Sequence, residues 1–195
     1  MKKNFHFLLT CNYNFKLNFM SGHNKFSKIK NKKAASDAKK SQSFSKLVKL
    51  IQQEAKISKG NLTSPGLKAV IEKAKADNMP KDTIDRAIKK GASNDTASME
   101  SVTFETYGPG GCGLIITGLT DNVNRTAAEI KHLLSKNGFQ LAAPGSASWA
   151  FEKTAEGWDA KTMVQISDED GEKLERIMDE LDDHDDVQEV YTNAE

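Results

Sequence analysis

The chain has 195 residues, of which 37% are hydrophobic and 28% are charged, enough for one domain or two small ones. This composition excludes collagen-like, disulfide-rich and wholly disordered proteins, and no run approaches the ~20 apolar residues of a membrane span. The two cysteines, Cys11 and Cys112, are spaced for neither a disulfide scaffold nor a zinc site, and they fit a reducing compartment.

The formal net charge of +1 conceals a strong polarity along the chain. Residues 20–91 hold 18 Lys and Arg against 6 Asp and Glu, whereas residues 92–195 hold 7 against 21. A basic half is therefore joined to an acidic half, and the basic half points to nucleic acid or an anionic membrane surface as its partner. We also expect the acidic half to compete with phosphate for the lysines, which would suppress non-specific binding.

Residues 1–19 show no helical or strand periodicity. Their apolar core, Phe7-Leu8-Leu9, is too short for a secretory signal, and the absence of arginine does not fit a mitochondrial presequence. We expect a dispensable disordered tail, or a start codon assigned upstream of the true one at Met20.

The basic half, residues 20–91, predicts three short helices behind a lysine-rich arm. Residues 21–40 carry few large apolar side chains, so we expect them to be mobile or only nascently helical. Apolar residues at helical spacing predict a first helix from Phe44 to Gly60, and Ser64-Pro65 and Pro80 predict the starts of two more. Residues 92–100 read as a polar linker.

The acidic half, residues 101–195, predicts a ferredoxin-like α+β domain with the order βαβ–βαβ. Thr126-x-x-Glu129 and Ser167-x-x-Asp170 predict the starts of its two helices. The expected strands are 102–106, 114–119, 146–151, 163–166 and 187–191. This order suits one antiparallel sheet with both helices on the same face.

No enzyme active site emerges from the pattern. GPGGCG at 108–113 matches G-x-G-x-x-G, but it precedes a strand where a dinucleotide site would open a helix, so we expect a hairpin turn. None of the four histidines has metal-ligand spacing, and the acidic run 168–171 places its glycine too early for an EF-hand. We expect a non-enzymatic protein without cofactor, metal or small-molecule substrate.

The arm lysines are the strongest functional signal, because clustered lysines on flexible stems neutralise phosphates without reading bases. Phe26 could add stacking on an exposed base. The candidate nucleic-acid-binding residues are Lys25, Phe26, Lys28, Lys30, Lys32, Lys33, Lys39 and Lys40. A solubilising tail is the alternative interpretation.

Five segments of the chain resemble the YebC/PmpR family. They are MSGHNKFSKIKNKKAASDAKKSQSFSKL from Met20, VIEKAKADNMPKDTIDRAIKKG, YGPGGCGLIITGLTDNVNRTAAEIKHLLSKNG, GSASWAF and DDVQEVYTN. The resemblance runs from Met20 to the C-terminus and leaves residues 1–19 outside the pattern. Members of this family typically carry an extra α/β domain where this chain has only the short stretch from Glu152 to Thr162.

The resemblance implies a cytoplasmic protein with a helical N-terminal domain and α/β domains behind it, binding nucleic acid without catalysis. The family includes bacterial transcriptional regulators and a mitochondrial translational activator. We therefore expect a DNA-binding transcriptional regulator, with a translation factor that binds the ribosome or RNA as the alternative. A blander third possibility is an adaptor whose acidic half binds a basic protein.

Overall fold

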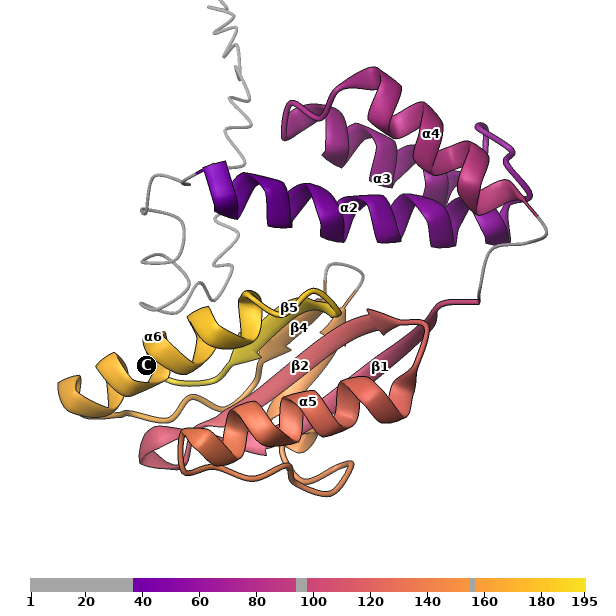
Figure 1. Cartoon of the computed structure of the whole chain (residues 1–195). Coiled ribbons are helices and arrows are strands. Elements are labelled where there is room, and N and C mark those ends of the chain that lie inside the picture. Colours follow the sequence, from indigo (N-terminus) through magenta and orange to yellow (C-terminus); the bar gives the residue numbers. More distant parts are fainter. Residues whose placement is uncertain (1–36, 94–97, 155–156) are drawn as a thin grey trace, which may run out of the picture.

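The computed structural model describes residues 37–93, 98–154 and 157–195, and side chains from residue 41 onward. A helical unit, residues 37–92, lies above a mixed α/β unit, residues 100–195 (Figure 1). The two units have separate hydrophobic cores. Within the described residues, no helix is both long enough and apolar enough to cross a membrane.

The helical unit consists of α2 (Asp37–Ile57), α3 (Pro65–Ala76) and α4 (Lys81–Ala92). The expected apolar stripe on α2 supplies Leu47, Ile51 and Ala55 to a core shared by all three helices. α3 begins with Ser64 at its N-cap and Pro65 at the first helical position, as the sequence predicts. α2 begins at Asp37 and not near Phe44, so residues 37–40 are already helical. Alanine and lysine are good helix formers and extend the packed helix by two turns.

Helices α2 and α4 approach each other closely at Gly91. A Cβ at this position would lie 2.3 Å from the backbone oxygen of Gln52, so we expect Gly91→Ala to separate the helices and destabilise the helical unit by ~1–3 kcal/mol. The matched control is Gly66→Ala on α3, whose Cβ would meet only the flexible carboxylate of Glu54. This control should be neutral or stabilising by up to ~1 kcal/mol. Urea unfolding followed by circular dichroism measures both, and equal effects at the two glycines would contradict the prediction.

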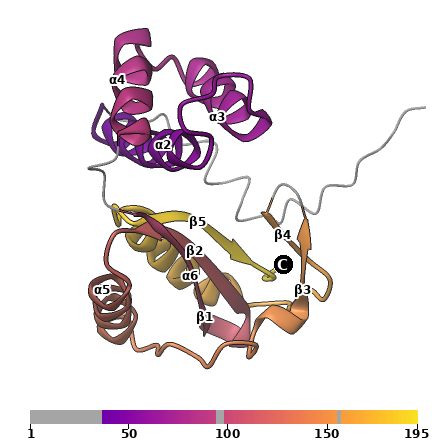
Figure 2. The ribbon, with the colours of Figure 1, turned by 90° about the vertical axis from the view of Figure 1, so that its right-hand side faces the viewer.

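The main sheet of the α/β unit is antiparallel and has the order β1-β2-β5. Its strands are β1 (Glu100–Tyr107), β2 (Gly113–Thr120) and β5 (Val187–Thr192). The GPGGCG segment forms the turn between β1 and β2, with positive φ at Gly110 and Gly111, as expected. Helices α5 (Val123–Lys136) and α6 (Asp168–Asp182) cover one face of this sheet over the larger core (Figure 2).

The ferredoxin-like prediction of one sheet built as βαβ–βαβ is not what the structure shows. Strands β3 (Phe151–Thr154) and β4 (Gly157–Ala160) form a separate hairpin on the other face of the sheet (Figure 2). Phe151 and Trp158 pack there against Ile115 and Tyr191. The expected strand 163–166 makes only a single parallel bridge, from Val164 to Ala194. The coarser prediction, an α+β fold, is confirmed.

The expected strand 146–151 is wrong for a reason that the structure makes plain. Residues Ser148–Ala150 form a short 3-10 turn, and β3 starts only at Phe151. The side chain of Glu105 accepts hydrogen bonds from the backbone N–H groups of Ala147 and Ser148, at 2.7 and 2.9 Å. These donors are therefore not available to a β-ladder, although the side chains alternate as they would in a strand.

The two predicted helix starts of the α/β unit have different outcomes. Ser167 caps α6 by accepting from the backbone N–H of Asp170 at 3.1 Å, as expected. In α5 the N-cap is Asn122, which accepts from the backbone N–H of Arg125 at 3.1 Å, so the Thr126 capping box is wrong. Thr126 lies inside the helix and is fully buried, where it takes part in the network described below.

Candidate nucleic-acid interface

Most of the predicted nucleic-acid-binding residues lie outside the part of the chain that the structure describes. This applies to Lys25, Phe26, Lys28, Lys30, Lys32 and Lys33. Lys39 and Lys40 fall on the first turns of α2, but their side chains are not among those described. The arm therefore remains a prediction from the sequence.

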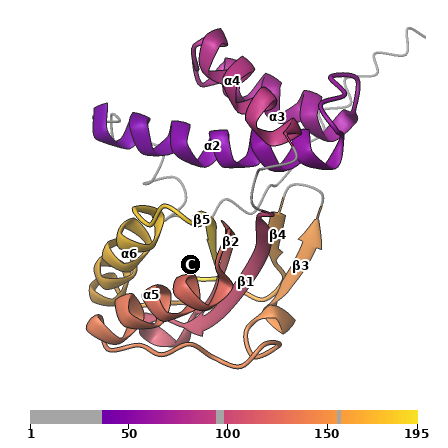
Figure 3. The ribbon, with the colours of Figure 1, turned by 45° about the vertical axis from the view of Figure 1, so that its right-hand side comes forward.

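Further basic side chains are exposed on the helical unit. They are Lys59, Lys68, Lys73, Lys75, Lys81, Arg86, Lys89 and Lys90. Most belong to α3 and α4, which lie on the side of α2 away from the sheet (Figure 3). The exposed acids Glu72, Asp82 and Asp85 interrupt this surface, so its positive field is weaker than that expected of the arm.

The inner face of α2 pairs lysines with the acidic half. Lys46 Nζ donates to the backbone oxygen of Asp182 at 2.7 Å and to its carboxylate at 3.1 Å. Lys49 Nζ donates to the carboxylate of Asp186 at 2.6 Å. These lysines were not singled out in the sequence because lysine on the polar face of an amphipathic helix is ordinary.

Asp186 is the centre of this contact and is only 4% exposed. Its second carboxylate oxygen accepts from Thr126 Oγ1 at 2.7 Å and from Arg125 Nη2 at 2.8 Å. Burial alone would raise the pKa of Asp186, but its bonds to Lys49, Thr126 and Arg125 hold that pKa well below its ordinary value. Asp186 thus stays ionised and ties α2, α5 and the start of β5 together.

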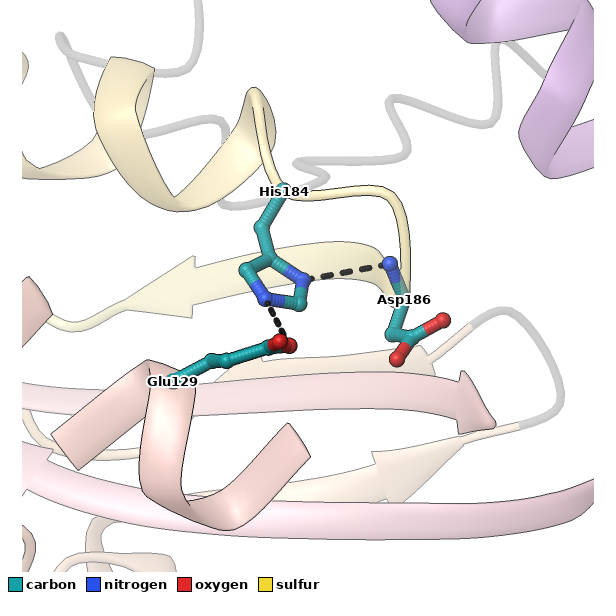
Figure 4. Close-up of side chains that lie close together, drawn as sticks. All are labelled: Glu129, His184 and Asp186. Atoms are coloured by element: carbon teal, nitrogen blue, oxygen red, sulfur yellow. Dashed lines mark hydrogen bonds and ion pairs between the residues drawn. The ribbon is translucent and has the colours of Figure 1, made fainter. Parts of the chain in front are cut away.

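His184, Glu129 and Asp186 form a second polar group beside this centre (Figure 4). The backbone N–H of Asp186 donates to His184 Nδ1 at 3.2 Å, so Nε2 carries the proton and donates to Glu129 at 3.0 Å. Three possible ligand atoms lie within 4.8 Å of one another. However, both imidazole nitrogens are engaged and Asp186 already binds two protein cations, so the arrangement fits a hydrogen-bond network and not a metal site.

Two of the motifs that carried the family resemblance meet around Glu105. This carboxylate accepts from the backbone N–H groups of Gly145, Ala147 and Ser148. Burial alone would raise the pKa of Glu105, but these three donors hold it below its ordinary value. The Tyr107 hydroxyl donates to the backbone oxygen of Ser146, so Glu105 and Tyr107 together fix the GSASWAF loop to β1.

A basic helical unit joined through ion pairs to an acidic α/β unit defines a class of charge-polarised α+β protein. Comparison with known sequences makes the assignment specific. Residues 24–94 match the pattern of the TACO1/YebC protein N-terminal domain, and residues 99–156 and 153–194 match that of the TACO1/YebC second and third domain. The chain belongs to the TACO1/YebC family, which confirms the expected YebC assignment.

Curated relatives and one solved structure are similar to this chain over most of its length. A probable transcriptional regulatory protein of Fervidobacterium nodosum is 37% identical over 89% of this chain and 93% of its own length. One from Thermotoga maritima is 45% identical over 82% of this chain and 61% of its own length. The crystal structure of a conserved hypothetical protein from Aquifex aeolicus has a TM-score of 0.74 at 28% identity, covering 82% of this chain and 91% of that one.

This chain lacks an internal segment that the Fervidobacterium relative contains. The alignment with the Fervidobacterium protein runs over 235 positions although it takes in 89% of a 195-residue chain. Several dozen positions of the relative therefore have no counterpart here. The two segments that match the second and third domain overlap at residues 153–156, which include the end of β3 at Thr154 and precede the start of β4 at Gly157. This agrees with the expected loss of an inserted domain between Glu152 and Thr162.

Proposed function

We propose that this protein is a non-enzymatic regulator of transcription that binds DNA through the lysine-rich arm and the helical unit, residues 20–91. The observation that carries the proposal is the concentration of 18 Lys and Arg against 6 acids in this segment. Such a segment gains affinity for polyanions by releasing their condensed counterions. The relatives named as probable transcriptional regulatory proteins support the regulatory role, and the family resemblance supports a cytoplasmic location.

The arm is proposed to supply affinity and not sequence specificity. Lysine side chains contact phosphates as point charges and position a protein on the duplex without reading its bases. Selectivity then has to come from the shape of the target or from control over which lysines are accessible. The three-way packing of α2, α3 and α4 gives the arm a rigid base from which to act.

The test replaces Lys30, Lys32 and Lys33 with Glu in the full chain. We expect binding to random duplex DNA to weaken at least tenfold, alike for all sequences, and the salt slope of log affinity to fall by about 3. The control replaces Lys131, Lys136 and Lys161, three exposed lysines of the α/β unit, with Glu. This control changes the net charge equally, so equal losses in the two variants would refute binding through the arm.

The same titration with single-stranded RNA of equal length separates the two functional classes. Tighter binding to duplex DNA supports a role in transcription. A clear preference for RNA would replace the transcriptional proposal with the translational alternative. The lysine variants cannot make this distinction, because both functions would use the same lysines. Fluorescence anisotropy with labelled oligonucleotides measures each affinity directly.

A further inference from the structure

The C-terminal end of α6 is unusually acidic. Its last turn holds no basic residue, and Asp182, Asp183, Asp185 and Asp186 follow one another around the turn into β5. A helix C-terminus already carries a partial negative charge from its unpaired carbonyl groups, so acidic side chains there repel each other and the helix end. This end of α6 is thus a place that favours a cation brought from elsewhere.

Helix α2 supplies two such cations, the side chains of Lys46 and Lys49. Lys46 bonds both the carbonyl and the carboxylate of Asp182, and Gln42 donates to the carbonyl of Asp183. Lys49 bonds the carbonyl of Asp185 at 2.9 Å besides the carboxylate of Asp186. Each lysine therefore lies among several oxygen atoms, which is the environment that a nucleic-acid backbone also offers. Farther along, Lys73 of α3 lies 3.7 Å from the carboxylate of Glu189.

The contact between the two units is polar and imperfectly packed. Each hydrophobic cluster of the described residues lies within one unit, and the cross-unit contacts of α2 are hydrogen bonds and ion pairs. A pocket of about 400 Å³ lies beside these bonds, between α2 and α3 on one side and the end of α6 and β5 on the other. Gln188, which lines it, has a buried amide nitrogen without a hydrogen-bond partner among the described residues. Opening such an interface exposes little apolar surface, so its main cost is the loss of the hydrogen bonds and ion pairs of Lys46 and Lys49.

We propose that the acidic segment 182–189 is an autoinhibitory surface that imitates phosphate and occupies Lys46, Lys49 and Lys73 until nucleic acid displaces it. This inference rests on the proposed function. In the closed arrangement these lysines, neutralised by their acidic partners, add little to the attraction of a random polyanion, and the neighbouring acids repel it. A target that supplies enough phosphates elsewhere on the basic half opens the contact and gains the three lysines as additional partners.

The decisive variant is Asp182→Asn combined with Glu189→Gln in the full chain. These two side chains remain 31% and 49% exposed, so their neutralisation leaves both cores intact. Asp186 is left unchanged because it also binds Arg125 and Thr126. The matched control is Glu152→Gln with Glu172→Gln, which removes the same charge from two exposed carboxylates that lie outside segment 182–189 and pair with no lysine among the described residues.

We expect the Asp182→Asn/Glu189→Gln chain to bind random duplex DNA about tenfold more tightly than the control at 50 mM salt. Two additional phosphate contacts steepen the salt slope by about 1.8, so the difference should nearly vanish at 200 mM salt. Equal affinities of variant and control at 50 mM salt would overturn the autoinhibition while leaving the proposed function standing. If the parent chain and both variants fail to bind DNA and RNA alike, the proposed function falls, and the autoinhibition with it.

Separation of the helical unit from the α/β unit is measured by energy transfer between two dyes, one on Lys89→Cys of α4 and one on Lys131→Cys of α5. Cys11 is replaced by Ser, and Cys112 is fully buried and can stay. Saturating duplex DNA is expected to lower the transfer efficiency of the parent chain, and the Asp182→Asn/Glu189→Gln chain should start from a lower efficiency without DNA. An efficiency that is unchanged by saturating DNA would show that the units bind as they stand, which overturns the proposal.

Discussion

The affinity of the full chain for random duplex DNA is expected to fall by about 10³ to 10⁵ between 50 and 200 mM salt. This is the range for a protein that neutralises ~6–10 phosphates, and the basic half holds 18 Lys and Arg. The physical reason is that each neutralised phosphate releases condensed counterions, which is favourable only while the bulk salt is dilute. Anisotropy titrations at four salt concentrations give the slope.

Sucrose at matching osmolarity is the control for this experiment, because it changes water activity without screening charge. It should leave the affinity nearly unchanged. A loss of less than tenfold over the same salt range would show that phosphate contact is not the main source of affinity. The basic half would then be a solubilising segment. This result would favour the interpretation of the protein as an adaptor whose acidic half binds a basic protein.

Removing the charge of Asp186 is expected to cost about 3 kcal/mol of unfolding free energy. Asn at this position cannot neutralise Arg125 and Lys49, and its amide turns a donor toward groups that themselves donate. The control, Asp185→Asn, changes an exposed carboxylate next to it and should stay within ~0.5 kcal/mol of the parent. Both tryptophans, Trp149 and Trp158, belong to the α/β unit, so their fluorescence during urea unfolding reports on this unit.

The same variant should also change the response to acid. Folding lowers the pKa of Asp186 below that of the unfolded chain, so its ionisation stabilises the fold fully only above the unfolded value of ~3.9. This contribution is lost as the pH falls below that value. The parent chain should therefore lose more unfolding free energy between pH 5 and pH 2.5 than Asp186→Asn does. Parallel stability curves for the two chains would show that the Asp186 network does not stabilise the charged form.

The positions of the helices and their buried faces follow from local information. The stripe of Leu47, Ile51 and Ala55, the Ser64-Pro65 start of α3 and the Ser167 cap of α6 were all visible in the sequence. Helical periodicity and capping depend on residues within four or five positions of one another, so one chain displays them directly. The same holds for the charge polarity and for the turn at Gly110 and Gly111.

Predictions from local patterns were wrong where a backbone group or side chain forms hydrogen bonds with a residue far away in the sequence. Ala147 and Ser148 alternate like a strand, but Glu105 takes their N–H groups from 42 and 43 positions away. Thr126 has the spacing of a capping residue, yet its hydroxyl bonds Asp186 across 60 positions. Nothing near either site in the sequence signals such partners.

The order of the amino acids is enough to show a basic and an acidic half, a helical segment, an α+β segment and the motifs of the family. Contacts between distant segments, in contrast, place β3 and β4 outside the main sheet and bring Lys49 and Arg125 to Asp186. The reason is that periodicity records which face of an element is buried, whereas ion pairing depends on which faces meet. A count of charges gives their sum along the chain, and the fold alone sets the distances that decide their partners.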